Sequence, residues 1–267
     1  MRGAPLAQQL SLFGQLGSTK VPDRIALTPK APTTQAIPLA PAVTTMHQIL
    51  IYADSLTWGI IPNTRERLPF DRRWPGVLEN ILLRGGLRVR VLEDCLVGRR
   101  TVWEDPFKPG RNGREGLAQR VEMHSPLSLV ILLLGTNDFQ FSHPYNDAWA
   151  ASQGIAALVA EIRNAPIEPG MPIPPILVVS PPLIRTPKGS IAPKFRGADD
   201  RCTDLPKAYE QVAVELGCDY LNAETVTRSS TIDGVHLDAD QHVILGTAIA
   251  DTVRDILKRR DSVHTHP

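Results

Sequence analysis

The sequence predicts an α/β fold in which helices cover both faces of a mainly parallel sheet. Two observations predict this class. From residue 47 onward, short apolar runs alternate with segments whose apolar residues recur at helical spacing, and such alternation is typical of parallel sheets. The strongest run, residues 127–134, is apolar at every position except Ser128, which suits a buried strand.

Each expected strand is a short run of apolar or alternating residues. Residues 49–52 suit a short buried strand, whereas residues 87–93 alternate like a strand with one covered face. Two prolines, Pro181 and Pro182, would close the fourth strand. The strands are predicted at residues 49–52, 87–93, 127–134, 176–180 and 219–222.

Four segments carry apolar residues at intervals of three and four. In the first, Asp71 would cap a helix that includes Trp74, and Gly85 would end it. The last would begin at Asp238, with Gln241 three residues later to complete a capping box. The helices are predicted after residue 71, at 148–164, at 205–216 and from 238 to about 257.

Composition excludes several classes of function. The 267 residues carry a net charge of +1 and no basic stripe, which argues against nucleic-acid binding. No apolar run approaches the roughly 20 residues that cross a bilayer, so we expect no membrane span. The three scattered cysteines indicate neither a disulfide framework nor a metal site, and no secretory signal is recognisable. We therefore expect a cytoplasmic location.

The chain is expected to divide near Met46. Residues 1–45 are rich in Pro, Ala, Thr and Gln, a composition that buries little surface. They are interpreted as a leader or extended arm that is not necessarily native, and a segment that docks on a neighbouring subunit would look the same. Residues 46–260 would form the catalytic domain and residues 261–267 a C-terminal tail.

Three residues suggest nucleophilic catalysis. Ser55 follows the first predicted strand, so its hydroxyl would lie at the carboxyl edge of the sheet. A serine hydroxyl becomes a good nucleophile only when a base takes its proton, and the base needs an orienting carboxylate. His236 and Asp233 supply both, because residues three apart in one turn of chain can face each other.

Acyl transfer also requires hydrogen-bond donors for the oxyanion of the tetrahedral intermediate. We expect three: the backbone N–H of Ser55, the backbone N–H of Gly98 after the second strand, and the side-chain amide of Asn137 after the third. All three follow strands, so one sheet edge would bring them together. Each motif alone can be explained as a turn, a loop or the start of a helix, but their joint occurrence favours a catalytic site.

Together these residues resemble the SGNH hydrolase family, also called GDSL-type esterases. The family has a Gly-Asp-Ser-Leu block, a conserved glycine, a Gly-x-Asn-Asp block and an Asp-x-x-His pair. Here, residues 53–56 read Ala-Asp-Ser-Leu, residues 135–138 read Gly-Thr-Asn-Asp and residues 233–236 read Asp-Gly-Val-His. The resemblance covers residues 48 to about 257 in the family's order. Only Ala53 departs from it, at a position that touches no catalytic atom.

The resemblance implies a flavodoxin-like three-layer α/β/α sandwich with a mainly parallel five-stranded sheet. Residues 54–59 (Asp-Ser-Leu-Thr-Trp-Gly) and 73–78 (Arg-Trp-Pro-Gly-Val-Leu) look like the arylesterase and acyltransferase branch, which includes bacterial perhydrolases. That branch commonly forms oligomers whose subunit contacts narrow the entrance to the active site. Some of its members transfer acyl groups to alcohols or peroxide. Both traits are implied by the resemblance only.

These observations predict a serine esterase for small acyl esters, including aryl esters, that needs no metal or cofactor and forms a homo-oligomer. A carbohydrate acetylesterase or a lysophospholipase of the same fold remains an alternative, and a non-catalytic binding module is a remote one. The loops at residues 62–70 and 184–201 are expected to act as lids or interface loops. The pocket is expected to be lined by Trp58, Phe139, Phe195 and Val235.

Overall fold

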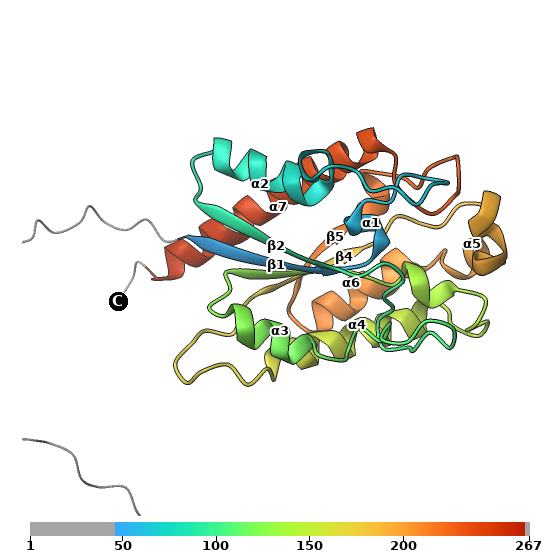
Figure 1. Cartoon of the computed structure of the whole chain (residues 1–267). Coiled ribbons are helices and arrows are strands. Elements are labelled where there is room, and N and C mark those ends of the chain that lie inside the picture. The colour runs from blue at the N-terminus through green and yellow to red at the C-terminus, as the bar shows by residue number, and fades with distance from the viewer. Residues whose placement is uncertain (1–45, 265–267) are drawn as a thin grey trace, which may run out of the picture. The chain divides into compact units, whose positions relative to one another are not determined.

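The computed structural model describes residues 46–264 (Figure 1). The leader expected at residues 1–45 and the last three residues of the expected tail lie outside the described residues. The final helix continues through residue 264, so the first part of the segment expected as a tail is helical.

The sheet contains five strands, all of them parallel, in the order β2-β1-β3-β4-β5. This arrangement confirms the predicted fold class. The described part of the chain enters the sheet in β1, adds β2 on one side and then crosses to add β3 on the other, so the strand order reverses between β1 and β3. The strands are β1 (His47–Ala53), β2 (Val89–Cys95), β3 (Leu129–Leu133), β4 (Ile176–Ser180) and β5 (Asp219–Asn222).

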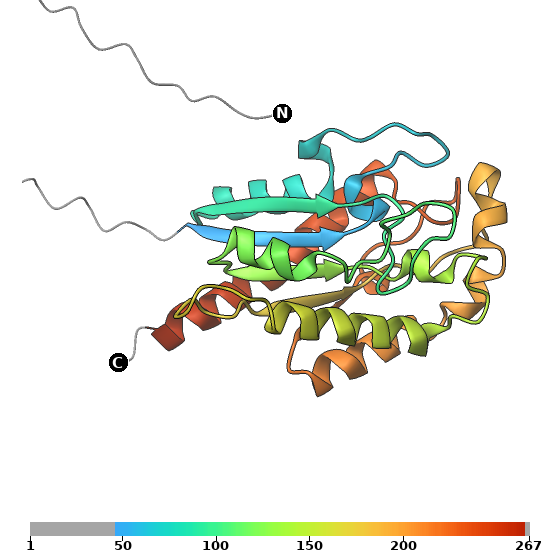
Figure 2. The same cartoon turned by 60° about the horizontal axis from the view of Figure 1, so that its bottom comes forward.

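Helices cover both faces of the sheet (Figures 1 and 2). On one face, α2 (Trp74–Arg84) packs against α7 (Ala239–His264). The other face carries α3 (Leu117–His124), α4 (Ala148–Arg163) and α6 (Leu205–Glu215). The short helices are α1 (Ser55–Trp58) and α5 (Ala198–Arg201), with 3-10 turns η1 (Phe70–Arg72), η2 (Thr136–Phe139), η3 (Gly189–Phe195) and η4 (Ala223–Thr225).

Alternate residues of the strands feed two apolar cores, one on each side of the sheet. In β1, Leu50 and Tyr52 belong to the core under α4 and α6, whereas Ile49 and Ile51 belong to the core under α2 and α7. The predicted core residue Trp74 is fully buried in the second cluster. Two buried faces explain why the central strands are apolar without interruption.

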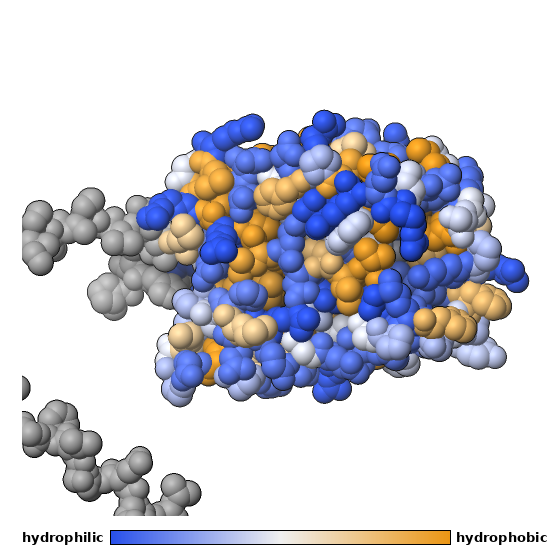
Figure 3. Space-filling model, in the orientation of Figure 1, coloured by the Kyte–Doolittle hydropathy of each residue, from blue (hydrophilic) through white to orange (hydrophobic). Residues whose placement is uncertain are grey.

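The edge of the sheet at β2 is less completely covered. Among the described residues this strand pairs with β1 alone, and most of its own residues are half-buried. Figure 3 shows apolar surface over this edge. Within the described residues, no helix is both long and apolar enough to cross a membrane.

The predicted cap of α2 and the predicted capping box of α7 differ from the structure. Asp71 lies in η1 rather than at the start of α2. Helix α2 instead has Pro75 in its first turn and is preceded by Arg73. The Arg73 guanidinium pairs with Glu93 at 2.5 Å (Nη2 to Oε2). A tertiary ion pair therefore stands beside the start of α2 in place of the predicted cap. Helix α7 begins directly after Asp238, as predicted, but Gln241 does not complete a capping box, because its amide donates to the Asp240 carboxylate and its oxygen accepts from Thr227.

Helix α4 approaches the loop after β2 closely at Gly154. A Cβ atom on Gly154 would overlap the Thr101 hydroxyl. Thr101 in turn donates hydrogen bonds from its backbone N–H, at 2.9 Å, and from its hydroxyl to the buried carboxylate of Asp138. The missing side chain at residue 154 therefore lets helix, loop and carboxylate meet.

We expect Gly154→Ala to lower the free energy of unfolding by roughly 1–3 kcal/mol, although alanine is the better helix former, because the methyl group would displace Thr101. Urea unfolding followed by circular dichroism would measure this. The matched control is Gln153→Ala on the exposed side of the same helix, which should change stability by less than about 0.5 kcal/mol. Equal effects of the two substitutions would contradict the close approach.

Candidate active site

The serine lies where the first strand ends and a helix begins. Ser55 is the first residue of α1, and the preceding Asp54 caps that helix by accepting the Leu56 N–H at 2.9 Å. Only 5% of Ser55 is exposed. The carboxylate cap therefore fixes the backbone that presents the hydroxyl.

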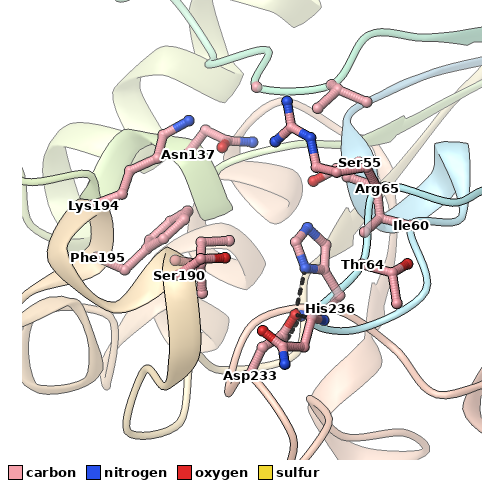
Figure 4. Close-up of a pocket in the computed structure, with 14 residues that line it drawn as sticks. Ser55, Ile60, Thr64, Arg65, Asn137, Ser190, Lys194, Phe195, Asp233 and His236 are labelled. Carbon is pink, nitrogen blue, oxygen red and sulfur yellow. Dashed lines mark hydrogen bonds and ion pairs between the residues drawn. The ribbon is translucent and has the colours of Figure 1, made fainter.

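A cavity of about 160 Å³ opens beside this turn (Figure 4). It brings together all five residues that the sequence predicts for catalysis and the oxyanion, namely Ser55, Gly98, Asn137, Asp233 and His236. These residues come from four separate segments of the chain. They meet because the carboxyl ends of β1, β2 and β3 share one edge of the sheet with the turn before α7.

The histidine and the aspartate form a tight pair. His236 donates from Nδ1 to Asp233 Oδ2 at 2.7 Å, and Asp233 Oδ1 accepts the backbone N–H groups of Val235 and His236 at 2.9 Å each. Gly234 permits this turn, because its φ is +79° and a Cβ atom would meet the carbonyl oxygen of Thr186 at 2.5 Å. The carboxylate thus holds both the ring and the backbone that carries it.

The same contacts keep Asp233 ionised. Burial alone would raise the pKa of its carboxyl, but the hydrogen bond and the charge of His236, with the two backbone N–H groups, outweigh burial and lower the pKa to about 2. Asp233 is therefore negative at neutral pH and can stabilise a protonated imidazole.

Figure 4 shows the His236 ring between Asp233 and Ser55. Asp233 holds Nδ1, so Nε2 is the nitrogen that remains for the serine. Within residues 46–264, no hydrogen bond joins the Ser55 hydroxyl to the ring. Such bonds commonly tighten only when a substrate is bound.

Two backbone donors face the cavity without an acceptor. Among the described residues, no group accepts the N–H of Ser55 or the N–H of Gly98. Gly98 adopts a φ of +86°, a conformation that suits glycine. A pair of free N–H groups beside a serine is the arrangement that stabilises an oxyanion.

Asn137 lines the same cavity, but both hydrogens of its amide already have acceptors. Nδ2 donates to Asp54 Oδ2 at 2.9 Å and to the carbonyl oxygen of Arg99 at 3.1 Å. Oδ1 accepts from Gln140 at 2.6 Å. Asn137 therefore connects the end of β3 to the serine turn and to the loop that carries Gly98.

Two buried carboxyl groups support these loops. Burial raises the pKa of Asp54 to about 6, although the Leu56 N–H and the charge of His236 oppose the shift. Burial likewise raises the pKa of Asp138 to about 7, against the hydrogen bonds from Thr101. Both carboxyls are fully buried and bind loop backbone.

The predicted pocket walls are mostly wrong. Trp58 does not line the cavity, because its ring lies against the Arg67 guanidinium, 4.7 Å from the ring centroid. Phe139 and Val235 face the apolar core instead, since both point inward from turns at the edge of the sheet. Phe195 does line the cavity, from the 3-10 turn η3.

Two loops supply the lining that sequence reasoning missed. Both were expected near the site as lids or interface loops, but no motif singled out their individual residues. The loop after α1 and the η3 segment contribute Ile60, Asn63, Thr64, Arg65, Ser190, Ile191 and Lys194, and Val97 adds to the wall beside Gly98. Within the part of the chain that the structure describes, no group of three His, Cys, Asp or Glu side chains could hold a metal ion.

A parallel α/β sheet with a serine, a histidine–aspartate pair and free backbone donors around one cavity has the components of a serine hydrolase. Residues 54–254 match the model of the GDSL-like Lipase/Acylhydrolase family. The match spans most of the chain, so the protein belongs to this family. The predicted SGNH/GDSL resemblance is thereby confirmed.

Solved structures and a curated relative agree with this class. A carbohydrate acetylesterase family member from Sinorhizobium meliloti is 33% identical (TM-score 0.74), and the M. smegmatis aryl esterase is 32% identical (TM-score 0.74); each comparison covers 79% of this chain and 99% of the other. An arylesterase of Vibrio mimicus is 30% identical over 100 residues, 38% of this chain. That match spans only 42% of the relative's length. With the family match, these neighbours identify the protein as a carboxylic ester hydrolase.

The raised pKa of Asp138 predicts a pH-dependent stability. The pKa of this carboxyl is near 3.8 in the unfolded state and about 7 in the native state, so the native state binds the proton more tightly. The contribution of Asp138 to stability therefore falls as the pH rises from about 4 to about 7. Asp138→Asn removes this titration while its side chain can still bond to Thr101.

We therefore expect the free energy of unfolding of Asp138→Asn, minus that of the wild type, to increase between pH 4 and pH 7 by roughly 1.4 kcal/mol for each unit of pKa shift. Urea titrations of both proteins across this range would measure it. A difference that stays constant with pH would contradict a raised pKa at Asp138.

Proposed function

We propose that the protein hydrolyses small acyl esters, including aryl acetates, through a covalent acyl-enzyme on Ser55. The observation that carries the proposal is the His236–Asp233 hydrogen bond of 2.7 Å in the cavity that also contains Ser55. A base that is oriented by an ionised carboxylate and faces a buried hydroxyl has a clear chemical use in acyl transfer.

In the first half of the reaction, His236 takes the proton of Ser55 as its oxygen attacks the ester carbonyl carbon. Asp233 stabilises the imidazolium that forms. The N–H groups of Ser55 and Gly98 bind the oxyanion, and Asn137 contributes if it shares one of its amide hydrogens. When the intermediate collapses, the bond to the alcohol breaks and His236 returns the proton to the leaving oxygen.

In the second half, water attacks the acyl-enzyme while His236 takes its proton. Collapse of the second intermediate releases the carboxylic acid and restores the Ser55 hydroxyl, with the proton supplied by His236. Another alcohol or hydrogen peroxide that enters the cavity can replace water. Attack by an alcohol or by peroxide in place of water would give the acyltransferase or perhydrolase activity that the sequence resemblance implies.

The size of the cavity favours a small acyl group. Its volume of about 160 Å³ is well below the 300–1,000 Å³ typical of sites for larger ligands. This argues against a lysophospholipase. A carbohydrate acetylesterase is the second candidate, supported by the similarity to the Sinorhizobium meliloti structure. Assays with acetylated xylan oligomers and lysolipids beside aryl acetates would separate the three activities.

We expect Ser55→Ala and His236→Ala each to lower kcat/KM for 4-nitrophenyl acetate by at least roughly 10³-fold, and the double variant to be hardly slower than either. The two residues act as one unit, so their effects should not add. Release of 4-nitrophenolate measures the rates, and circular dichroism verifies folding. Additive losses, or labelling of Ser55→Ala by a fluorophosphonate probe at the wild-type rate, would refute the proposed nucleophile. Failure of the wild type to react with the probe would favour a non-catalytic binding module.

We also propose a cytoplasmic location, supported by the three cysteines, none of which forms a disulfide. A homo-oligomer is proposed from exposed aromatic side chains at the start of α4. Tyr145 is 95% exposed and Trp149 67% exposed. Large aromatic side chains at this exposure are typical of interfaces between subunits.

Light scattering after size exclusion should give a mass that is a multiple of 29.3 kDa for the wild type. Changing both Tyr145 and Trp149 to Ser should shift this mass toward that of the monomer, because the buried aromatic area would be lost. The control is Val214→Ser, an exposed apolar residue on α6. A wild type that is monomeric at every concentration would contradict the proposal.

A further inference from the structure

We propose that the cavity selects esters that carry a negatively charged group, with Arg65 and Lys194 as the residues that determine this specificity. This inference rests on the proposed esterase function and names a substrate class for the same site. The two side chains line the cavity together with Ser55 and come from different loops. Figure 4 shows Arg65 on the side of Ser55 and Lys194 on the side of Asn137 and Phe195.

Neither cationic side chain is held by a protein partner. Across residues 46–264, the Arg65 guanidinium and the Lys194 ammonium donate no hydrogen bond and form no ion pair. Other arginines nearby behave differently, because Arg73 pairs with Glu93 and Arg99 with Asp94. Both side chains are also exposed, so they can reorient toward a ligand.

The cavity contains no acidic group that would neutralise these charges. Asp233 is the one carboxylate in its lining among the described residues, and it is already bound to the His236 ring. A lining with two unpaired cations and one carboxylate that is already bound to His236 favours anions over cations.

The charged groups around Lys194 are mostly cationic. Partial burial of the otherwise exposed side chain lowers the pKa of its ammonium, Asp105 opposes that effect, and the like charges of Arg100, Lys108 and Arg111 lower the pKa further. Within residues 46–264, the Arg111 guanidinium donates only to backbone carbonyl groups, one of them that of Val97 beside Gly98. A bound anion would relieve the repulsion among these cations.

The ligand chemistry that fits is a carboxylate or a similar anion a few bonds from the ester. It can belong to the acyl part or to the alcohol part of the substrate, and the cations lie on two sides of the cavity. Two pairs of substrates distinguish an anion in the alcohol part from an anion in the acyl part. For the alcohol part, 3-acetoxybenzoate is compared with 3-acetoxybenzamide, and for the acyl part, 4-nitrophenyl hemisuccinate is compared with 4-nitrophenyl succinamate after subtraction of the uncatalysed rates.

The experiment measures the ratio of kcat/KM for the anionic ester to kcat/KM for its neutral amide. We expect a wild-type ratio of about tenfold in at least one pair, equivalent to 1.4 kcal/mol. Arg65→Gln and Lys194→Gln should each lower it, and the double variant should bring it to about one, whereas Arg65→Lys and Lys194→Arg should retain it. The control Lys258→Gln, at an exposed position on α7, should leave the ratio unchanged.

Ionic strength gives a second measurement that needs no variant. Raising the salt concentration should increase KM for the anionic esters more than for the neutral ones, because salt screens exposed charges. A wild-type ratio near one in both pairs, or a ratio unchanged in the double variant, would overturn the inference. Hydrolysis of 4-nitrophenyl acetate by the same wild-type sample separates this failure from failure of the proposed esterase function.

Discussion

The buried carboxylate of Asp54 is the interaction on which the rest of the site depends. One of its oxygens caps α1 through the Leu56 N–H, and the other accepts the Asn137 amide at 2.9 Å. These bonds tie the end of β1 to the end of β3, the two strands between which the strand order reverses. Burial makes the charged form costly, as the pKa of about 6 shows. Neutral pH and four surrounding groups keep this carboxylate charged, and its hydrogen bonds then hold the serine turn.

The loop after β2 is positioned by buried arginines rather than by apolar packing. The Arg99 guanidinium donates to the carbonyl oxygen of Ala53 at 3.0 Å and pairs with Asp94 at 2.7 Å. Its own carbonyl accepts the Asn137 amide. Gly98 is the adjacent residue, so the direction of its free N–H follows from these contacts. Charged hydrogen bonds are directional, and they can therefore fix a donor to an accuracy that apolar contacts do not provide.

The sequence predicts the strands and the catalytic residues of this site better than the other residues that line the cavity. The strands at 176–180 and 219–222 match β4 and β5 residue for residue, because apolar pattern and turn residues both mark their ends. The five predicted catalytic and oxyanion residues meet in one cavity because parallel strands end at a common edge. Trp58, Phe139 and Val235 were misplaced because proximity along the chain does not determine the direction of a side chain. Arg65 and Lys194 were missed because two irregular loops carry no periodic pattern from which their approach to Ser55 could be inferred.

The catalytic and oxyanion residues lie at strand ends and in the turn before α7, whereas the two cations lie in irregular loops. This difference implies different roles for the two groups within one cavity. Groups at strand ends are held by buried hydrogen bonds, so they can offer the fixed geometry that a short-lived oxyanion requires. Asn137 illustrates the limit of that rigidity: an amide hydrogen given to the oxyanion must come from Asp54 or from the Arg99 carbonyl. In the proposed mechanism the free backbone N–H groups of Ser55 and Gly98 therefore bind the oxyanion, and Asn137 adds a third hydrogen bond only when one of its amide hydrogens leaves its present acceptor. The exposed loop cations have no such bonds to break, which suits them to distinguish one substrate from another without disturbing the chemistry.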